Sequence, residues 1–325
     1  MTRLSLTFAK SFSVSQREDN ELPIPEAVSA RGIPSGSLLF GRGAKNTECL
    51  AADPKGALGL NLLYAPAEPL VDFIFVHGLG GGSRKTWSKT SSVKDFWPQE
   101  WLPKDLAFKN VRIHSFGYDS DWAKGKVNFL NIRHFGKSLL GQMSTLACLR
   151  DADTPIVLIG HSMGGLVIKK AYNLARQTAA YESLANRVHS IYFLATPHSG
   201  SDSAKLLSDI LQFASIPREY VAELKRDSGT IQTISNDFRN YERDLDLWSF
   251  YETLPLSMGK IFSRIIVPPD SAVMGFRDEK EMLMNADHRS ICKFDSIADP
   301  NYQILRNSLE TTVIEISKTG NYSYP

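Results

Sequence analysis

The sequence predicts an α/β protein built on a doubly wound, mostly parallel sheet. Short apolar runs alternate with segments of helical spacing over roughly 250 residues, which is the pattern of successive strand–helix units. The clearest unit is 155–168, where β-prone apolar residues enter a Gly-His-Ser-Met-Gly turn and a helix-forming segment follows. Ligands of such sheets bind beyond the carboxyl ends of the strands, so the loops after the strands are where a site is expected.

The strand candidates are short, β-prone runs bounded by proline, glycine or polar residues. Val71–Val76 is almost wholly apolar, which predicts a strand buried on both faces in the middle of the sheet. The strands are expected at 56–64, 71–76, 111–116, 156–159, 188–195, 245–251 and 264–267.

Helices are expected between and after these strands. Apolar residues recur at helical spacing over 128–149, and 302–316 is a candidate closing helix. The segment 203–245 looks helical, is interrupted by Pro217 and Gly229, and is expected to form a lid inserted between late strands. A cluster of aromatic residues after the second strand is expected to pack as core rather than to form a ligand cage. It comprises Trp87, Phe96, Trp97 and Trp101.

Composition excludes several function classes. The chain has 325 residues, 42% hydrophobic and 22% charged, with a net charge of +2, so a polyanionic partner such as nucleic acid is not expected. The three cysteines, Cys49, Cys148 and Cys292, lie far apart without metal-ligand spacing. We therefore expect reduced thiols, no metal and an intracellular protein.

Three regions are expected along the chain. Residues 1–55 are rich in proline, glycine and serine and predict a flexible N-terminal segment, 56–317 form the folded domain, and 318–325 form a tail. The first 17 residues are basic and carry three apolar residues on one helical face. They predict either a mitochondrial transit peptide or a disordered basic tail, so a cytoplasmic and a mitochondrial location both stay open.

Ser162 is the expected nucleophile. A Gly-x-Ser-x-Gly turn between a strand and a helix forces the serine into a strained conformation, and Gly160 and Gly164 leave room for it because they lack a Cβ. The hydroxyl then stands beside a helix N-terminus, which favours negative charge. A serine hydroxyl is a weak nucleophile unless a base lies next to it.

His288 is the expected base. His189 lies within a strand candidate, and His198 comes too early to leave an acid-bearing strand between serine and histidine. His288 lies in the polar loop after the last strand candidate, where the chain order nucleophile–acid–histidine requires it.

Glu252 is the favoured acid, because it directly follows the 245–251 strand candidate. Asp270 is the alternative if that strand belongs to the lid. Asp202 follows the strand after the nucleophile, a less common position. Asp287 adjoins His288, and sequence neighbours rarely reach the required carboxylate–imidazole geometry.

Two backbone N–H groups are expected to hold the oxyanion of a tetrahedral intermediate. One belongs to Met163, after the nucleophile, and the other to Leu79 or Gly80, in the glycine-rich loop after the second strand. This loop lacks the Lys-Ser/Thr of a phosphate-binding loop and the spacing of a dinucleotide fingerprint, so no cofactor is expected.

Five motifs along the chain form a specific combination. They are Val76-His77-Gly78-Leu79-Gly80-Gly81, Gly160-His161-Ser162-Met163-Gly164-Gly165, Phe193-Leu194-Ala195-Thr196-Pro197-His198, Ser249-Phe250-Tyr251-Glu252 and Ala286-Asp287-His288. In this combination the chain resembles the lipase-like serine esterases of the α/β-hydrolase superfamily found alone or at the front of fungal NACHT and ankyrin proteins. SERAC-type proteins and GPI inositol-deacylases are more distant relatives. The resemblance covers roughly residues 56–317.

This resemblance implies the α/β-hydrolase fold, an acid at Glu252, and chemistry on a carboxylic ester or lipid acyl group. The expected function is hydrolysis of a lipid or other acyl ester through an acyl-enzyme on a Ser-His-Glu triad. An acyltransferase or a thioesterase on the same triad is an alternative, and a non-catalytic interaction module is less favoured because all candidate triad positions are filled. The expected partner is a small-molecule or lipid substrate, with possible peripheral membrane contact through the lid, and the oligomeric state is open.

Overall fold

The computed structural model describes residues 53–120, 130–198, 231–258 and 262–319. They belong to one compact unit, Ala51–Pro325. Several expectations lie outside the described residues: the N-terminal segment up to residue 52, the greater part of the lid (203–230) and the tail from residue 320. The described parts of the chain contain no helix long and apolar enough to cross a membrane.

The predicted α/β-hydrolase sheet is confirmed. Its seven strands lie in the order β1-β3-β2-β4-β5-β6-β9, and all neighbours pair in parallel except β1 with β3. The strands are β1 (Gly59–Tyr64), β2 (Val71–Val76), β3 (Val111–Gly117), β4 (Ile156–His161), β5 (Val188–Leu194), β6 (Asp246–Glu252) and β9 (Lys280–Met284). A separate antiparallel hairpin consists of β7 (Leu256–Met258) and β8 (Phe262–Arg264).

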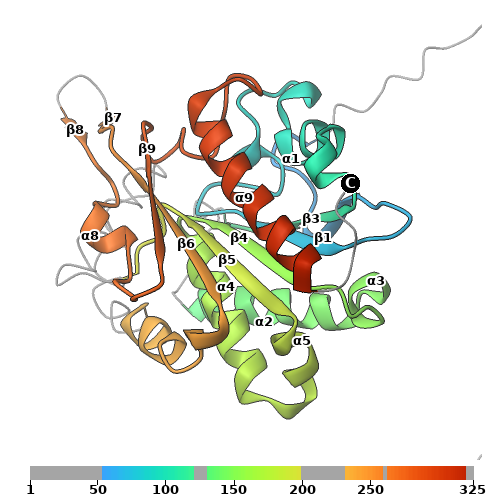
Figure 1. Cartoon of the computed structure of the whole chain (residues 1–325). Coiled ribbons are helices and arrows are strands. Elements are labelled where there is room, and N and C mark those ends of the chain that lie inside the picture. The colour runs from blue at the N-terminus through green and yellow to red at the C-terminus, as the bar shows by residue number, and fades with distance from the viewer. Residues whose placement is uncertain (1–52, 121–129, 199–230, 259–261, 320–325) are drawn as a thin grey trace, which may run out of the picture. The chain divides into compact units, whose positions relative to one another are not determined.

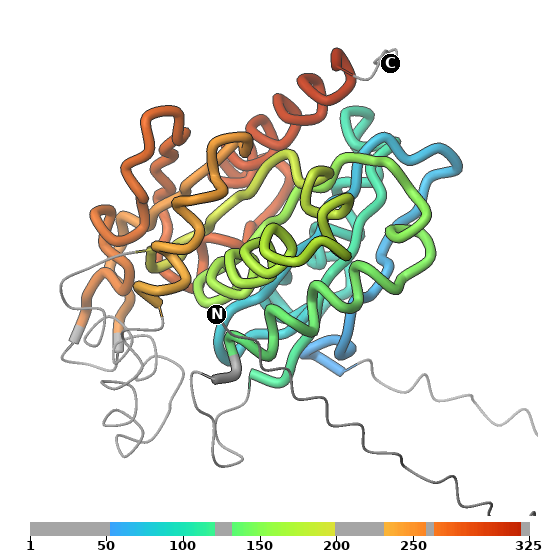
Figure 2. Tube along the Cα trace, turned by 90° about the horizontal axis from the view of Figure 1, so that it is seen from below, coloured from blue at the N-terminus to red at the C-terminus, as the bar shows by residue number. Residues whose placement is uncertain are grey.

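Helices cover both faces of this sheet (Figures 1 and 2). The longer helices are α2 (Leu130–Thr145), α4 (Met163–Gln177) and α9 (Pro300–Thr319), and the shorter ones are α1 (Trp97–Glu100), α3 (Ala147–Arg150), α5 (Glu182–Asn186) and α8 (Pro269–Ala272). Single 3₁₀ turns are η1 (Lys85–Trp87), η2 (Val93–Asp95), η3 (Leu102–Lys104), η4 (Leu106–Phe108), η6 (Ala179–Tyr181) and η8 (Glu242–Asp244), and residues 231–238 are also helical.

Two apolar clusters fix these layers. On one face, α2, α4 and α5 pack against the sheet through buried residues such as Leu139 and Val167. On the other face, α1 and α9 pack through residues such as Leu305 and Leu309. The aromatic cluster after β2 belongs to this second core, where Trp87 and Trp97 are fully buried, so the expectation of core packing fits the structure.

Two expectations for the late strands were wrong. The predicted strand 264–267 is instead the end of β8 and a turn, in which Ile266 and Val267 are buried. The last strand of the sheet is β9, which the sequence analysis missed because its Lys-Glu-Met-Leu-Met stretch lacks an apolar run. Within the described residues β9 is an edge strand that pairs with β6 alone, and edge strands tolerate charged residues.

A buried ionic network lies at the start of the central strands. Asp72 in β2 is fully buried, and its carboxylate accepts hydrogen bonds from Arg112 at 2.6 and 2.9 Å and from Thr154. The Nε2 atom of His114 lies 3.3 Å from the same carboxylate. Burial raises the pKa of Asp72, but the hydrogen bonds from His114, Arg112 and Thr154 outweigh this effect and hold it below its ordinary 3.8.

We expect Asp72→Asn to lower the free energy of unfolding by about 3–5 kcal/mol, because Arg112 is left buried without its counter-charge. Chemical denaturation at pH 7 measures this loss, and Asp151→Asn, in an exposed pair with Arg150, is the matched control without effect. The folded-state pKa of Asp72 lies below its unfolded value. Its contribution is therefore complete above pH 4 or so and is lost at lower pH in the wild type. Equal stability of the two variants at pH 7 would contradict this account.

Candidate active site

Ser162 lies at a strained turn between β4 and α4. Its φ is 53° and ψ is −124°, a backbone conformation that residues other than glycine rarely adopt. Its N–H donates to the carbonyl of Leu194 at 2.9 Å, and its own carbonyl accepts from Gly165 at 3.1 Å. These bonds fix the turn between the carboxyl ends of β4 and β5. Ser162 therefore lies at the carboxyl edge of the sheet.

The turn is pressed against the end of β2. A Cβ on Gly164 would lie 2.2 Å from the carbonyl oxygen of Val76 and 2.5 Å from that of His77. A Cβ on Gly160 would lie 2.7 Å from the backbone nitrogen of Gly165. Both positions therefore require glycine, as the sequence pattern predicted.

His288 lies between Ser162 and Glu252. Its Nε2 is 2.9 Å from the Ser162 hydroxyl, and its Nδ1 is 3.1 Å from the Oε2 atom of Glu252. A carboxylate only accepts, so Nδ1 carries the proton and Nε2 is free to accept from the hydroxyl. All three residues are at most 2% exposed, so water competes little for these bonds.

Glu252 is the last residue of β6, one position earlier relative to the strand end than expected. Its second carboxylate oxygen, Oε1, accepts from the N–H of Val267 at 2.5 Å. The turn at 266–267, which was predicted as a strand, thus holds the carboxylate in place. The sequence carried no signal for this backbone donor.

The rival acids have other surroundings. Asp287 accepts hydrogen bonds from the N–H groups of Arg289 and Ser290, both at 2.9 Å, and so shapes the turn that presents His288. Asp270 is exposed in the first turn of α8. Asp202 lies outside the described residues.

The rival histidines are not at the site. His189 is half-buried in β5, where its Nδ1 lies 2.7 Å from the Ser190 hydroxyl. His198 is buried beside Phe193, and within the described residues its ring nitrogens have no hydrogen-bond partner. Burial, and then the charge of Lys169, holds the pKa of His198 well below its ordinary value.

The loop after β2 forms a tight turn beside Ser162. The N–H of Gly81 donates to the carbonyl of Gly78 at 3.2 Å, and Gly80 has a φ of 66°, which favours glycine at this position of a turn. The Nζ atom of Lys85 donates to the carbonyl of Gly80 at 3.2 Å. Among the described residues, the N–H groups of Leu79, Gly80 and Met163 have no hydrogen-bond acceptor, as required of oxyanion donors.

His77 is a neutral residue that holds this loop in place through its ring nitrogens. Its Nε2 accepts from the N–H of Tyr118 at 3.1 Å, so the proton is on Nδ1, which donates to the carbonyl of Gly78 at 2.8 Å. The ring stacks on Tyr118 at 4.1 Å, and the Tyr118 hydroxyl donates to the His77 carbonyl at 2.6 Å. Burial lowers the pKa of His77 to about 4, so this pattern of donors persists at neutral pH.

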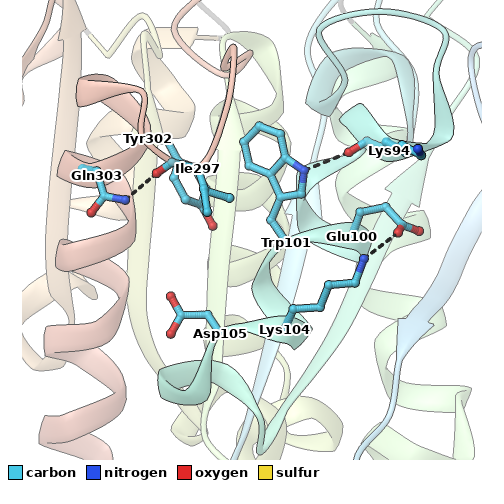
Figure 3. Close-up of a pocket in the computed structure, with 8 residues that line it drawn as sticks. All are labelled: Lys94, Glu100, Trp101, Lys104, Asp105, Ile297, Tyr302 and Gln303. Carbon is cyan, nitrogen blue, oxygen red and sulfur yellow. Dashed lines mark hydrogen bonds and ion pairs between the residues drawn. The ribbon is translucent and has the colours of Figure 1, made fainter.

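A groove of about 560 Å³ lies apart from these residues, between α1, η3 and the start of α9 (Figure 3). Trp101 packs edge-on against Tyr302 at 5.1 Å and donates to the carbonyl of Lys94. The full lining is Lys94, Glu100, Trp101, Lys104, Asp105, Ile297, Tyr302 and Gln303. This lining does not include Ser162, His288 or Glu252. In the described part of the chain, no group of three acidic, histidine or cysteine side chains could hold a metal ion.

The fold and site define a lipase-like α/β hydrolase, as the resemblance predicted. Residues 71–267 match the family model described as "PGAP1-like alpha/beta domain", and the chain belongs to this family. The matched range contains Ser162 and Glu252 and ends before His288.

Individual relatives agree with this assignment. The chain is 31% identical over 259 residues to Protein SERAC1 of Bos taurus, covering 73% of this chain and 38% of that protein. It is 28% identical over 169 residues to a triacylglycerol lipase of Burkholderia plantarii, covering 48% of this chain and 40% of that protein. The chain thus spans about two fifths of the curated relatives it matches. The crystal structure of Bacillus licheniformis lipase BlEst2 in its mature form aligns with a TM-score of 0.52 at 16% identity, over 79% of this chain and 99% of that one, which shows the fold.

We expect Gly164→Ala to lower the free energy of unfolding by about 3 kcal/mol or more, because the new Cβ meets two backbone carbonyls that cannot move aside independently. Gly141→Ala is the matched control. It lies in α2 with nothing within 4 Å of its added Cβ, so it should gain about 0.5–1 kcal/mol. Thermal and denaturant unfolding of both variants measure the difference. A Gly164→Ala protein as stable as the wild type would show that the turn is not packed as described.

Proposed function

We propose that this protein is a serine hydrolase that cleaves a carboxylic ester by a Ser162–His288–Glu252 triad. The observation that carries the proposal is the continuous hydrogen-bond path from the Ser162 hydroxyl through both ring nitrogens of His288 to Glu252. A neutral imidazole accepting from the hydroxyl is what a weak nucleophile requires.

In the proposed mechanism, the Ser162 oxygen attacks the ester carbonyl carbon while its proton passes to Nε2 of His288. Glu252 stabilises the imidazolium and holds the ring. The N–H of Met163 and that of Leu79 or Gly80 donate to the oxyanion. The bond between the acyl carbon and the ester oxygen then breaks, and the alcohol leaves with the proton from His288. Water then attacks the acyl-enzyme with His288 again as base, which releases the acid and restores Ser162.

The surroundings of Ser162 support an apolar acyl group. Leu79 packs on a small apolar cluster formed by the turn at 266–267 and its neighbours. Its buried members are Leu256, Ile266, Val267 and Ala272. The proposed substrate class is therefore a lipid or other acyl ester, which agrees with the similarity to the triacylglycerol lipase of Burkholderia plantarii.

We expect Ser162→Ala to lower ester turnover by roughly 10⁴-fold or more and to abolish labelling by a fluorophosphonate probe, because it removes the hydroxyl that lies 2.9 Å from Nε2 of His288. Turnover of p-nitrophenyl butyrate and gel-based labelling measure the two effects. Ser144→Ala is the control and should match the wild type, because the Ser144 hydroxyl donates to the carbonyl of Gly141 within α2. Undiminished turnover by purified Ser162→Ala protein would reject the proposal.

The triad acid can be identified by paired amide variants. Glu252→Gln should lower kcat by roughly 10²–10⁴-fold, because a neutral amide neither stabilises the imidazolium nor selects the required tautomer. Asp270→Asn should leave kcat within a factor of two or so, because this carboxylate is exposed on α8. Steady-state kinetics of both purified variants decide between them, and the reverse order of effects would assign the acid to Asp270.

A further inference from the structure

His161 connects the nucleophile turn to the loop that carries His288. It is the last residue of β4, directly before Ser162, and its Nε2 lies 2.9 Å from the backbone carbonyl oxygen of His288. A carbonyl only accepts, so Nε2 carries a proton and donates it. The two residues are 127 positions apart, and the hydrogen bond is buried.

The charge state of His161 suits this role. Within the described residues its Nδ1 has no hydrogen-bond partner, so the ring is held by its Nε2 donor alone. Burial, and then the nearby charge of His288, lowers the pKa of His161 to about 3. A neutral ring at this position adds no repulsion when His288 takes up a proton, although the ring centroids are only 5.2 Å apart.

Other bonds hold the histidine loop at positions on either side of His288. The carbonyl of Ala286 accepts from the N–H groups of Thr253 and Leu254 at 3.2 and 3.0 Å, and the carbonyl of Cys292 accepts from Trp97 at 3.0 Å. The Asp287 turn is internal to the loop, and Glu252 reaches only the side chain of His288. Further along, Lys293 donates to the carbonyl of Lys85 at 2.8 Å, five residues after His288. The His161 bond therefore acts on the main chain of residue 288 itself. A displacement of about 1 Å at a catalytic group can cost about 10²-fold in rate.

We propose that His161 is a positioning residue, which holds the main chain of His288 so that its Nε2 faces the Ser162 hydroxyl. The inference rests on the proposed function, and it assigns His161 no contact with substrate. It goes beyond the triad, because it assigns to His161 a part in setting the distance between base and nucleophile.

Two amide variants test this inference in the full-length chain. Gln carries its NH₂ group as many bonds from the backbone as Nε2 of histidine, whereas the NH₂ group of Asn is one bond shorter. His161→Asn should lower kcat on p-nitrophenyl butyrate, and the rate of fluorophosphonate labelling, by roughly tenfold or more with KM within about threefold. His161→Gln should recover most of that loss, because its donor reaches the His288 carbonyl. Rates are expressed per folded molecule, using the circular dichroism spectrum and melting temperature of each variant.

Equal kcat values for His161→Asn and the wild type would overturn the inference. Equal losses in the Asn and Gln variants, with KM and melting temperature moving together, would also overturn it, because that pattern indicates a general packing role. Ser162→Ala separates these results from a failure of the proposed function. If the wild type turns over ester and Ser162→Ala does not, the proposed function stands whatever His161 does. A wild type that neither labels nor turns over ester would overturn both.

Discussion

The close approach of the Ser162 turn to the end of β2 is the constraint on which the rest of the site depends. A Cβ on Gly164 would meet the carbonyls of Val76 and His77, so α4 starts directly against the strand that leads into the Gly78–Gly81 turn. One contact therefore fixes the nucleophile, the first N–H groups of α4 and the second donor loop relative to each other. The positive φ of Ser162 is the strain that this packing maintains.

The register between β6 and β9 fixes the positions of the acid and the histidine loop in the other half of the site. Glu252 pairs with Met284 at the ends of the parallel strands β6 and β9, and His288 follows four residues later. A slip of one residue in β6 would turn Glu252 to the opposite face of the sheet. Neutral, buried histidines then complete the arrangement, with His77 holding one loop and His161 the other.

Much of this could be predicted from the sequence, because the informative signals are local. The strand–turn–helix pattern at Ser162 and the near-continuous apolarity of β2 depend only on neighbours in the chain. Chain order sufficed to select His288 and to favour Glu252, which the structure brings together with Ser162.

The rest depends on contacts between distant segments. The predicted strand at 264–267 is instead the end of β8 and a turn, in which the N–H of the buried Val267 donates to Glu252. The strand β9 begins with two charged residues, which suits its place at the edge of the sheet in the described part of the chain. The bond between His161 and the His288 carbonyl spans 127 positions, and neither residue's neighbours indicate it.

The distribution of the site along the chain has a consequence for biosynthesis. Ser162 and His288 are 126 positions apart, and β9 and the histidine loop are among the last parts of the sheet to leave the ribosome. Such long-range pairings form late in folding. Under the proposed function, Ser162 would be unreactive in a nascent or truncated chain. Reaction of Ser162 with a fluorophosphonate would therefore indicate that the sheet has formed through β9.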